Sequence, residues 1–92
     1  MMLIILENVP VSLRGELSRW MLEPRAGIFI GDVSALVRNE LWEKCQNKIG
    51  SGGVLQIWST NTEQGFAMRA FGDTKRVIID AEGLQLIRIP SG

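Results

Sequence analysis

Apolar residues occur along the chain in two arrangements, continuous runs and spaced stripes. Residues 2–7 (MLIILE) are apolar up to the final glutamate, which is typical of a central strand covered on both faces. Shorter apolar runs between turn residues predict further strands at 27–31, 54–59, 65–71, 76–80 and 84–89. A polar turn joins two of them, 54–59 and 65–71, which are expected to form a hairpin.

Two spaced stripes predict amphipathic helices between the first strands. The stripes consist of Leu13, Leu17, Trp20 and Met21, and of Val37, Leu41, Cys45 and Ile49. Pro10 suits the first turn of the earlier helix, and Pro24 is expected to end that helix near Glu23. Either Asp32 or Ser34 can cap the later helix.

The predicted order of elements is β-α-β-α-β-β-β-β. This order favours an α+β ferredoxin-like sandwich, with two short strands added at the carboxyl end. The two helices can cover only one face of the sheet. Because the first strand is apolar on both sides, the uncovered face is expected to be buried in a symmetric homodimer.

The composition restricts the chemistry available to the chain. Its 92 residues suit one small domain, and ten basic residues balance ten acidic ones, so any nucleic-acid binding must be local. Histidine, the usual general base and the commonest metal ligand, is absent. The single cysteine, Cys45, excludes an internal disulfide and fits the cytoplasm. No apolar run approaches the roughly 20 residues that span a bilayer, so no membrane partner is expected.

Glu7 and Asn8 end the first strand and are the first candidate site. A carboxylate at a strand end can hold a hard cation such as Mg²⁺, but one carboxylate is a poor site without partners. Asp32, after the second predicted strand, or the same residues of a second subunit could supply them. The simpler interpretation is a turn made by Asn8 and a solvated carboxylate on Glu7.

Two stretches of the sequence suggest contacts with phosphate. Gly15 lies almost opposite the apolar stripe of the first helix, beside Arg14, and costs about 1 kcal/mol relative to alanine. The glycine lets another backbone, such as a phosphate chain, come close, or it is simply tolerated. Lys75 and Arg76 follow the strand at 65–71 and suit phosphate contacts, although such pairs also protect exposed sheet edges.

Other features have a simple structural explanation. The stretch STNTEQGF (59–66) includes Glu63 but is typical of a plain turn. Cys45 lies in an apolar stripe and is expected in the core rather than as a nucleophile. The final run LQLIRI (84–89) is either the last strand of the chain's own sheet or a strand that pairs with another protein.

Taken together, the motifs resemble one family. The pattern ENVP…LRG.L..W.LE.RAG.(F/Y)(I/V)GDVS…VR…W, then W.TNTE.GF…FG…R…D..GL.L, is similar to the small second CRISPR-associated protein of the type I-E branch. The resemblance runs from Leu3 to about Ile89, and RAGIFIGDVSA (25–35) and WSTNTEQGF (58–66) are its most specific parts.

The resemblance implies a ferredoxin-like fold, a symmetric homodimer and a role in spacer acquisition. In that role the dimer bridges two dimers of the CRISPR integrase and holds the protospacer, a double-stranded DNA, for integration into the CRISPR array. The chain would divide into a core, 1–76, and carboxyl-terminal strands and tail, 77–92, that dock on the dimer partner or the integrase. The apolar residues expected to make this contact are Leu84, Leu86, Ile87 and Ile89.

The resemblance also assigns roles to charged residues. Arg14, Lys75 and Arg76 match positions that contact the DNA backbone. Glu7 matches the strand-end acid credited in the wider family with metal-dependent cleavage of RNA or DNA. Glu63 and Glu82 match acids that have been discussed as possible active-site residues. A Mg²⁺ cofactor is implied only if the chain is a nuclease, whereas in the type I-E branch a scaffold is expected.

Departures from the family weaken the expected DNA contact. Ser12 and Glu16 stand where relatives carry basic residues, and Leu36 replaces a common lysine. We therefore expect weak DNA binding by the isolated dimer, with the integrase supplying most of the affinity. Whether the chain is an enzyme stays open from the sequence. A small-molecule sensor is a third class, supported by fold analogy alone.

Overall fold

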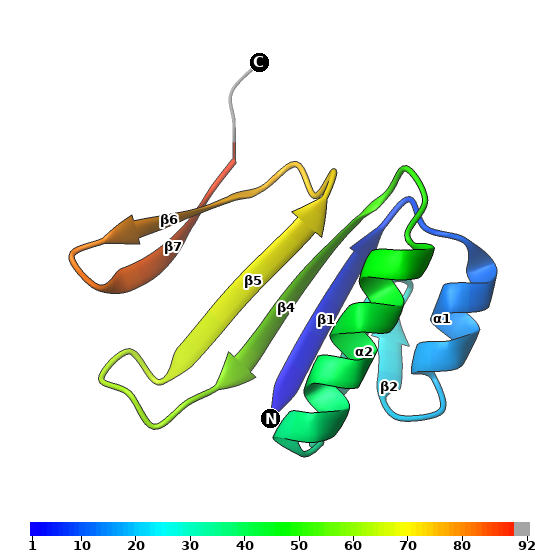
Figure 1. The fold of residues 1–92 in the computed structure, drawn as a ribbon, viewed down its shortest axis with the longest axis horizontal. Coiled ribbons are helices and arrows are strands. Elements are labelled where there is room, and N and C mark those ends of the chain that lie inside the picture. Colours follow the sequence, from blue (N-terminus) through cyan, green and yellow to red (C-terminus); the bar gives the residue numbers. More distant parts are fainter. Residues whose placement is uncertain (90–92) are drawn as a thin grey trace.

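A five-stranded antiparallel sheet in the order β2-β3-β1-β4-β5 forms the centre of the structure, a computed structural model that describes residues 1–89. Its strands are β1 (Met2–Glu7), β2 (Leu22–Arg25), β3 (Ile28–Gly31), β4 (Gly53–Ser59) and β5 (Phe66–Gly72). Helices α1 (Val11–Leu17) and α2 (Ala35–Lys48) lie on one face of the sheet (Figure 1). Strands β6 (Val77–Ala81) and β7 (Leu84–Arg88) form a separate antiparallel pair.

This arrangement confirms the predicted ferredoxin-like α+β fold. The elements β1-α1-β2 and β3-α2-β4 are two βαβ units in one sheet, and β5 is added at the edge of β4. The second sheet begins at Val77, where the carboxyl-terminal segment 77–92 was expected to begin. Residues 90–92 of that segment lie outside the described residues.

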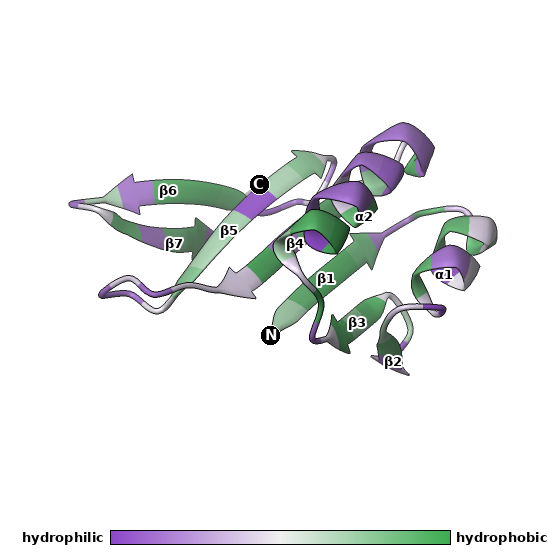
Figure 2. Cartoon of the chain, turned by 60° about the horizontal axis from the view of Figure 1, so that its bottom comes forward, coloured by the Kyte–Doolittle hydropathy of each residue, from purple (hydrophilic) through white to green (hydrophobic). Residues whose placement is uncertain are grey.

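Strand β1 separates the two faces of the sheet. Met2, Ile4 and Leu6 are buried under the helices, and Ile4 has no exposed surface. Leu3 and Ile5 alternate with them, so they point to the opposite face, where they are only half-buried. Figure 2 shows β1 apolar along its length, as predicted for a strand that packs on both sides.

The helices dock through the predicted apolar stripes, except that Trp20 lies beyond the end of α1 and is 53% exposed. Leu41 and Cys45 of α2 and Leu13 and Leu17 of α1 are buried in the main core. Ser34 caps α2, because its Oγ accepts a hydrogen bond from the Val37 N–H at 3.2 Å. An ion pair of 2.8 Å between Lys48 Nζ and Glu16 Oε1 joins the two helices on their outer side.

The predicted end of the first helix was wrong. We expected the helix to continue to Glu23, but α1 ends at Leu17, and residues 22–25 form the additional strand β2. Pro24 is compatible with this strand because β2 is the outer strand of the sheet, where a missing N–H breaks no interior ladder. A turn follows α1 at residues 18–20, and the Met21 N–H donates to the Leu17 carbonyl across it at 3.0 Å.

Two glutamine side chains attach the β6-β7 hairpin to β5. The Gln85 carboxamide accepts from the Met68 N–H at 2.7 Å and donates to the Met68 carbonyl at 3.1 Å. The Gln64 carboxamide binds the Gln85 backbone in the same way, at 2.7 and 2.9 Å. The hairpin is therefore held beside the edge of β5 without being a strand of the main sheet.

Two glycines let three chain segments meet at one end of the sheet. A Cβ on Gly52 would overlap the carbonyl oxygens of Glu7 and Asn8, and a Cβ on Gly53 would overlap the backbone of Asp73. The Asp73 N–H also donates to the Gly52 carbonyl at 3.0 Å. Glycine is required here because backbone, which cannot move aside, occupies the space of a side chain.

We predict opposite effects for two glycine substitutions. Gly53→Ala should lower the free energy of unfolding by about 1–3 kcal/mol or more, because its methyl group overlaps the Asp73 backbone. Gly15→Ala, the control, meets no atom within 4 Å and should raise that free energy by up to about 1 kcal/mol. Urea denaturation of both variants measures the difference. Equal stabilities would contradict the close approach described above.

Candidate functional site

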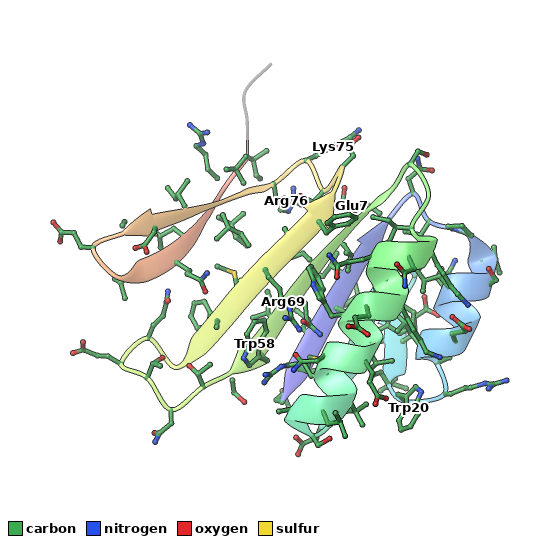
Figure 3. All side chains as sticks on the ribbon, in the orientation of Figure 1. Glu7, Trp20, Trp58, Arg69, Lys75 and Arg76 are labelled. Carbon is green, nitrogen blue, oxygen red and sulfur yellow. The ribbon has the colours of Figure 1, made fainter. Side chains whose placement is uncertain are left out.

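The end of the sheet at which β1 stops carries acidic and basic residues from separate segments. Glu7 is the last residue of β1 and pairs with Gly53. Lys75 and Arg76 lie in the turn from β5 to β6, at the same end of the sheet (Figure 3). The fold therefore places Glu7 at the same end of the sheet as Lys75 and Arg76, which lie far from it in the sequence; all three were predicted as site residues.

Backbone geometry presents these side chains to solvent. Asn8 and Lys75 adopt left-handed conformations, with φ of 54° and 57°. Thr74 is only 5% exposed, and its hydroxyl donates to the Arg76 carbonyl at 2.8 Å and lies 3.2 Å from the Arg76 N–H. The buried threonine fixes the turn while Lys75 and Arg76 are exposed, a geometry suited to phosphate contacts.

Arg14 is less available than the sequence suggested. Its Nε donates to Glu23 Oε2 at 2.8 Å, and the same oxygen accepts from the Gly27 N–H at 2.9 Å. These hydrogen bonds, first that from Arg14, lower the pKa of Glu23. The carboxylate fixes the guanidinium in place and offsets part of its charge. Gly15 beside it faces open space, as predicted.

Glu7 does not meet Glu63 or Asp32 within one chain. Glu7 lies at the β4 end marked by Gly53, whereas Glu63 follows the opposite end of β4 at Ser59, about 20 Å away along the strand. Asp32 also lies at that far end, because Gly31 pairs with Met2 at the start of β1. The expectation that Asp32 could join Glu7 as a ligand is therefore wrong for a single chain.

The donor set of one chain does not suit Mg²⁺ at Glu7. Within residues 1–89, no group of three or more His, Cys, Asp or Glu side chains is placed to hold a metal ion. Mg²⁺ requires several oxygen ligands in near-octahedral geometry, which one strand-end carboxylate does not provide. A Mg²⁺ site at Glu7 would need ligands in addition to those that residues 1–89 place there.

Two of the candidate acids, Glu63 and Glu82, line the same hollow at the far end of the sheet. Glu63, in the β4-β5 turn, and Glu82, in the β6-β7 turn, line one hollow with Thr60, Gln64 and Gln85. Attachment of the hairpin to β5 brings the two turns together. Sequence patterns did not pair these acids, because the contact depends on the side chains of the two glutamines.

Apolar side chains remain exposed on the carboxyl-terminal hairpin. Leu84, Leu86, Ile87 and Ile89 are 45%, 45%, 41% and 66% exposed. A groove between this hairpin and the open face of the sheet is lined by Ile57, Met68 and Leu86, among others. The hairpin and the open face thus form two neighbouring surfaces that the described chain leaves uncovered.

Cys45 is confirmed as a core residue. It has no exposed surface, and burial, with a smaller contribution from the charge of Glu16, raises the pKa of its thiol to about 12. At that pKa almost no reactive thiolate forms at neutral pH. Neither helix described for residues 1–89 is long and apolar enough to cross a membrane.

The sequence did not predict a cluster of arginines and tryptophans between α2 and β5. Arg38 lies over the Trp58 ring at 4.7 Å, and Arg69 lies over Trp42 at 4.7 Å and Trp58 at 5.0 Å. Helical spacing places Arg38 and Trp42 on one side of α2, which was a usable signal. The part played by Arg69 depends on strand register, which the sequence does not show.

The fold and this surface define a small ferredoxin-like α+β protein with an apolar open face and a basic turn at one end of its sheet. Comparison with protein families identifies the family to which this protein belongs. The family model described as "CRISPR-associated protein (Cas_Cas2CT1978)" matches residues 1–86. The chain belongs to this family of CRISPR-associated proteins, which confirms the resemblance seen in its motifs.

The ion pair of Arg14 predicts a pH-dependent stability. Because folding lowers the pKa of Glu23, its contribution is present above about pH 4.5 and is lost as the pH falls through the lower folded value. Glu23→Gln should be less stable than the wild type at neutral pH and lose less stability on acidification.

Urea midpoints between pH 3 and pH 7 would measure this difference, with Glu63→Gln, in an exposed turn, as the control. The pH dependence of stability that remains in Glu23→Gln should include a contribution from Glu16, because the hydrogen bond from Lys48 lowers the pKa of that carboxylate. Identical pH profiles for wild type and Glu23→Gln would contradict a structural role for this pair.

Proposed function

We propose that the chain serves CRISPR adaptation as a homodimeric scaffold that bridges two integrase dimers and holds the protospacer duplex for integration. The observation that carries the proposal is the separation of Glu7, the strand-end acid, from the other acidic candidates, while the proposed binding surfaces are exposed. Glu7 is separated from Glu63 and Asp32 by the length of a strand, whereas the basic turn and the apolar surfaces are exposed. Family membership supports the same role, and the cytoplasm is the proposed compartment.

The open face of the sheet is the proposed dimer surface. Leu3, Ile5, Ile28, Ile30 and Ile57 share this face according to the strand register, and each is half-buried in the single chain. Burying such side chains against a second copy is favourable by roughly 25 cal/mol per Å² of apolar surface. A small domain, which buries a limited fraction of its own surface, benefits from this additional burial.

The basic turn and the hairpin are the proposed contacts with DNA and integrase. Lys75 and Arg76 are free of ion pairs within residues 1–89, whereas Arg14 is bound to Glu23. This difference supports a larger contribution from the turn than from Arg14. The exposed Leu84, Leu86, Ile87 and Ile89 offer the integrase an apolar patch that could form the buried core of an interface.

Removing the basic pair should reduce the salt dependence of duplex binding. We expect Lys75→Gln/Arg76→Gln to lower the slope of log K against log salt by about 0.9 for each phosphate that the variant no longer neutralises. Arg25→Gln/Lys44→Gln removes the same charge from exposed positions elsewhere and is the control. Fluorescence anisotropy of the integrase complex with a labelled duplex measures the slope. Equal slopes for the two double variants would contradict a DNA contact at this turn.

A metal-dependent nuclease is the alternative function, favoured by the position of Glu7 beside two basic residues. It requires Glu7 of two subunits to share a cation. If the chain is a scaffold, Glu7→Ala/Glu63→Ala should stimulate in-vitro integration by the cognate integrase as well as the wild type does.

The integration assay compares no small protein, wild type and the double variant, with assembly checked on a sizing column. A variant that assembles but no longer stimulates would contradict the scaffold proposal. Magnesium-dependent cleavage that is lost in Glu7→Ala would establish the nuclease. A wild type that neither assembles nor stimulates would overturn both.

A further inference from the structure

The cluster between α2 and β5 holds two cations against the same aromatic ring. Arg38 comes from the first turn of α2 and Arg69 from the middle of β5, and both lie over Trp58, at 4.7 and 5.0 Å. Figure 3 shows Arg69 and Trp58 side by side between the helix and the sheet. Guanidinium–indole stacking is favourable, but two like charges on one ring repel each other.

Within the described part of the chain, no carboxylate offsets these charges. The ion pairs of residues 1–89 join Met1 to Asp32, Arg14 to Glu23 and Lys48 to Glu16, and none includes Arg38 or Arg69. Partial burial, and then the neighbouring charge of Arg38, lower the pKa of Arg69. The Arg38 Nε atom is itself buried and has no hydrogen-bond acceptor among residues 1–89. The cluster is therefore short of both negative charge and acceptors.

A fully buried amide fixes this arrangement. Gln56 has no exposed surface, and its Oε1 accepts from Arg69 Nε at 2.6 Å. Its Nε2 donates to the Arg38 carbonyl at 3.1 Å, and Asn39 Oδ1 accepts from Arg69 Nη2 at 2.9 Å. Neutral amides thus orient Arg69 without cancelling its charge, which a glutamate at position 56 would do. Arg69 therefore keeps a positive charge that no carboxylate within residues 1–89 neutralises, and guanidinium groups form strong bidentate hydrogen bonds with carboxylates and phosphates.

We propose that Arg38 and Arg69 form a phosphate-binding site, separate from the turn at Lys75 and Arg76. A phosphate group between the two guanidiniums supplies the missing negative charge and hydrogen-bond acceptors. Paired arginines suit this ligand because their planar N–H groups match its oxygens. The group comes either from a nucleic-acid backbone or from a small free phosphate compound. Because both tryptophan rings are covered by guanidinium, the site recognises phosphate rather than a stacked base.

The test is a titration of the isolated wild-type chain, followed through the arginine Nε–H resonances in NMR spectra. Inorganic phosphate, or a short oligothymidine, is added at constant ionic strength with chloride as the reference anion. We expect saturable shifts at Arg38 and Arg69, but not at the exposed Arg25 and Arg88. No saturable shift, or equal shifts at all four arginines, would overturn the site.

The two probes distinguish the source of the phosphate. If oligothymidine saturates the shifts at a lower concentration of phosphate groups than inorganic phosphate does, the natural ligand is a nucleic-acid backbone. If oligothymidine binds equally or more weakly, the natural ligand is a free phosphate compound. The titration needs neither integrase nor duplex, so it remains informative if the proposed function fails. In the titration with inorganic phosphate, Lys75→Gln/Arg76→Gln should leave the shifts at Arg38 and Arg69 unchanged, and loss of these shifts in that variant would count against a separate site.

A matched pair of variants tests whether the unneutralised charge matters. Gln56→Glu places a carboxylate against Arg69 and should weaken phosphate binding several-fold, whereas Asn47→Asp makes the same chemical change on the exposed side of α2 and should not. Equal affinities for the two would contradict the proposal. If Gln56→Glu does not fold, Arg38→Gln against Arg25→Gln makes the same comparison, with loss of binding expected only for Arg38→Gln.

Discussion

The close approach of three backbone segments at Gly52 and Gly53 is the constraint on which the basic end of the molecule depends. Without side chains at these positions, the ends of β1 and β5 come into contact with the start of β4. The β5-β6 turn then lies at the same end of the sheet as Glu7, and the β6-β7 hairpin follows directly from this turn. Packing of bare backbone thus determines where the charged and apolar surfaces lie relative to each other.

The sequence predicted the fold well where a pattern is local. The strand 2–7, the stripe of α2 and the outward position of Gly15 were all confirmed. Strand β2 was missed because Pro24 normally ends a helix, and its acceptance in an outer strand depends on the order of strands in the sheet. Strand order is a property of the assembled sheet and leaves little trace in a short segment.

The sequence predicted which residues are candidates for the site, but not which of them lie close together in the fold. Glu7, Lys75 and Arg76 do meet at one end of the sheet, whereas Asp32 and Glu63 lie at the other. Which strand ends meet follows from antiparallel pairing, which periodicity alone does not reveal. The zero net charge likewise concealed an uneven distribution: Arg14 and Lys48 have carboxylate partners, whereas Arg38 and Arg69 share an indole.

The attachment of the hairpin to β5 has a consequence for exchange of partners. The Gln85 carboxamide offers Met68 one N–H and one C=O, as a residue of a neighbouring strand would. A strand arriving from another molecule would replace these two hydrogen bonds by two of the same kind, so the substitution is close to neutral in hydrogen-bond energy. The Gln85 amide therefore occupies the hydrogen-bonding groups of Met68 and protects the edge of β5 from non-specific strand pairing. A strand that fits this edge better can displace the amide.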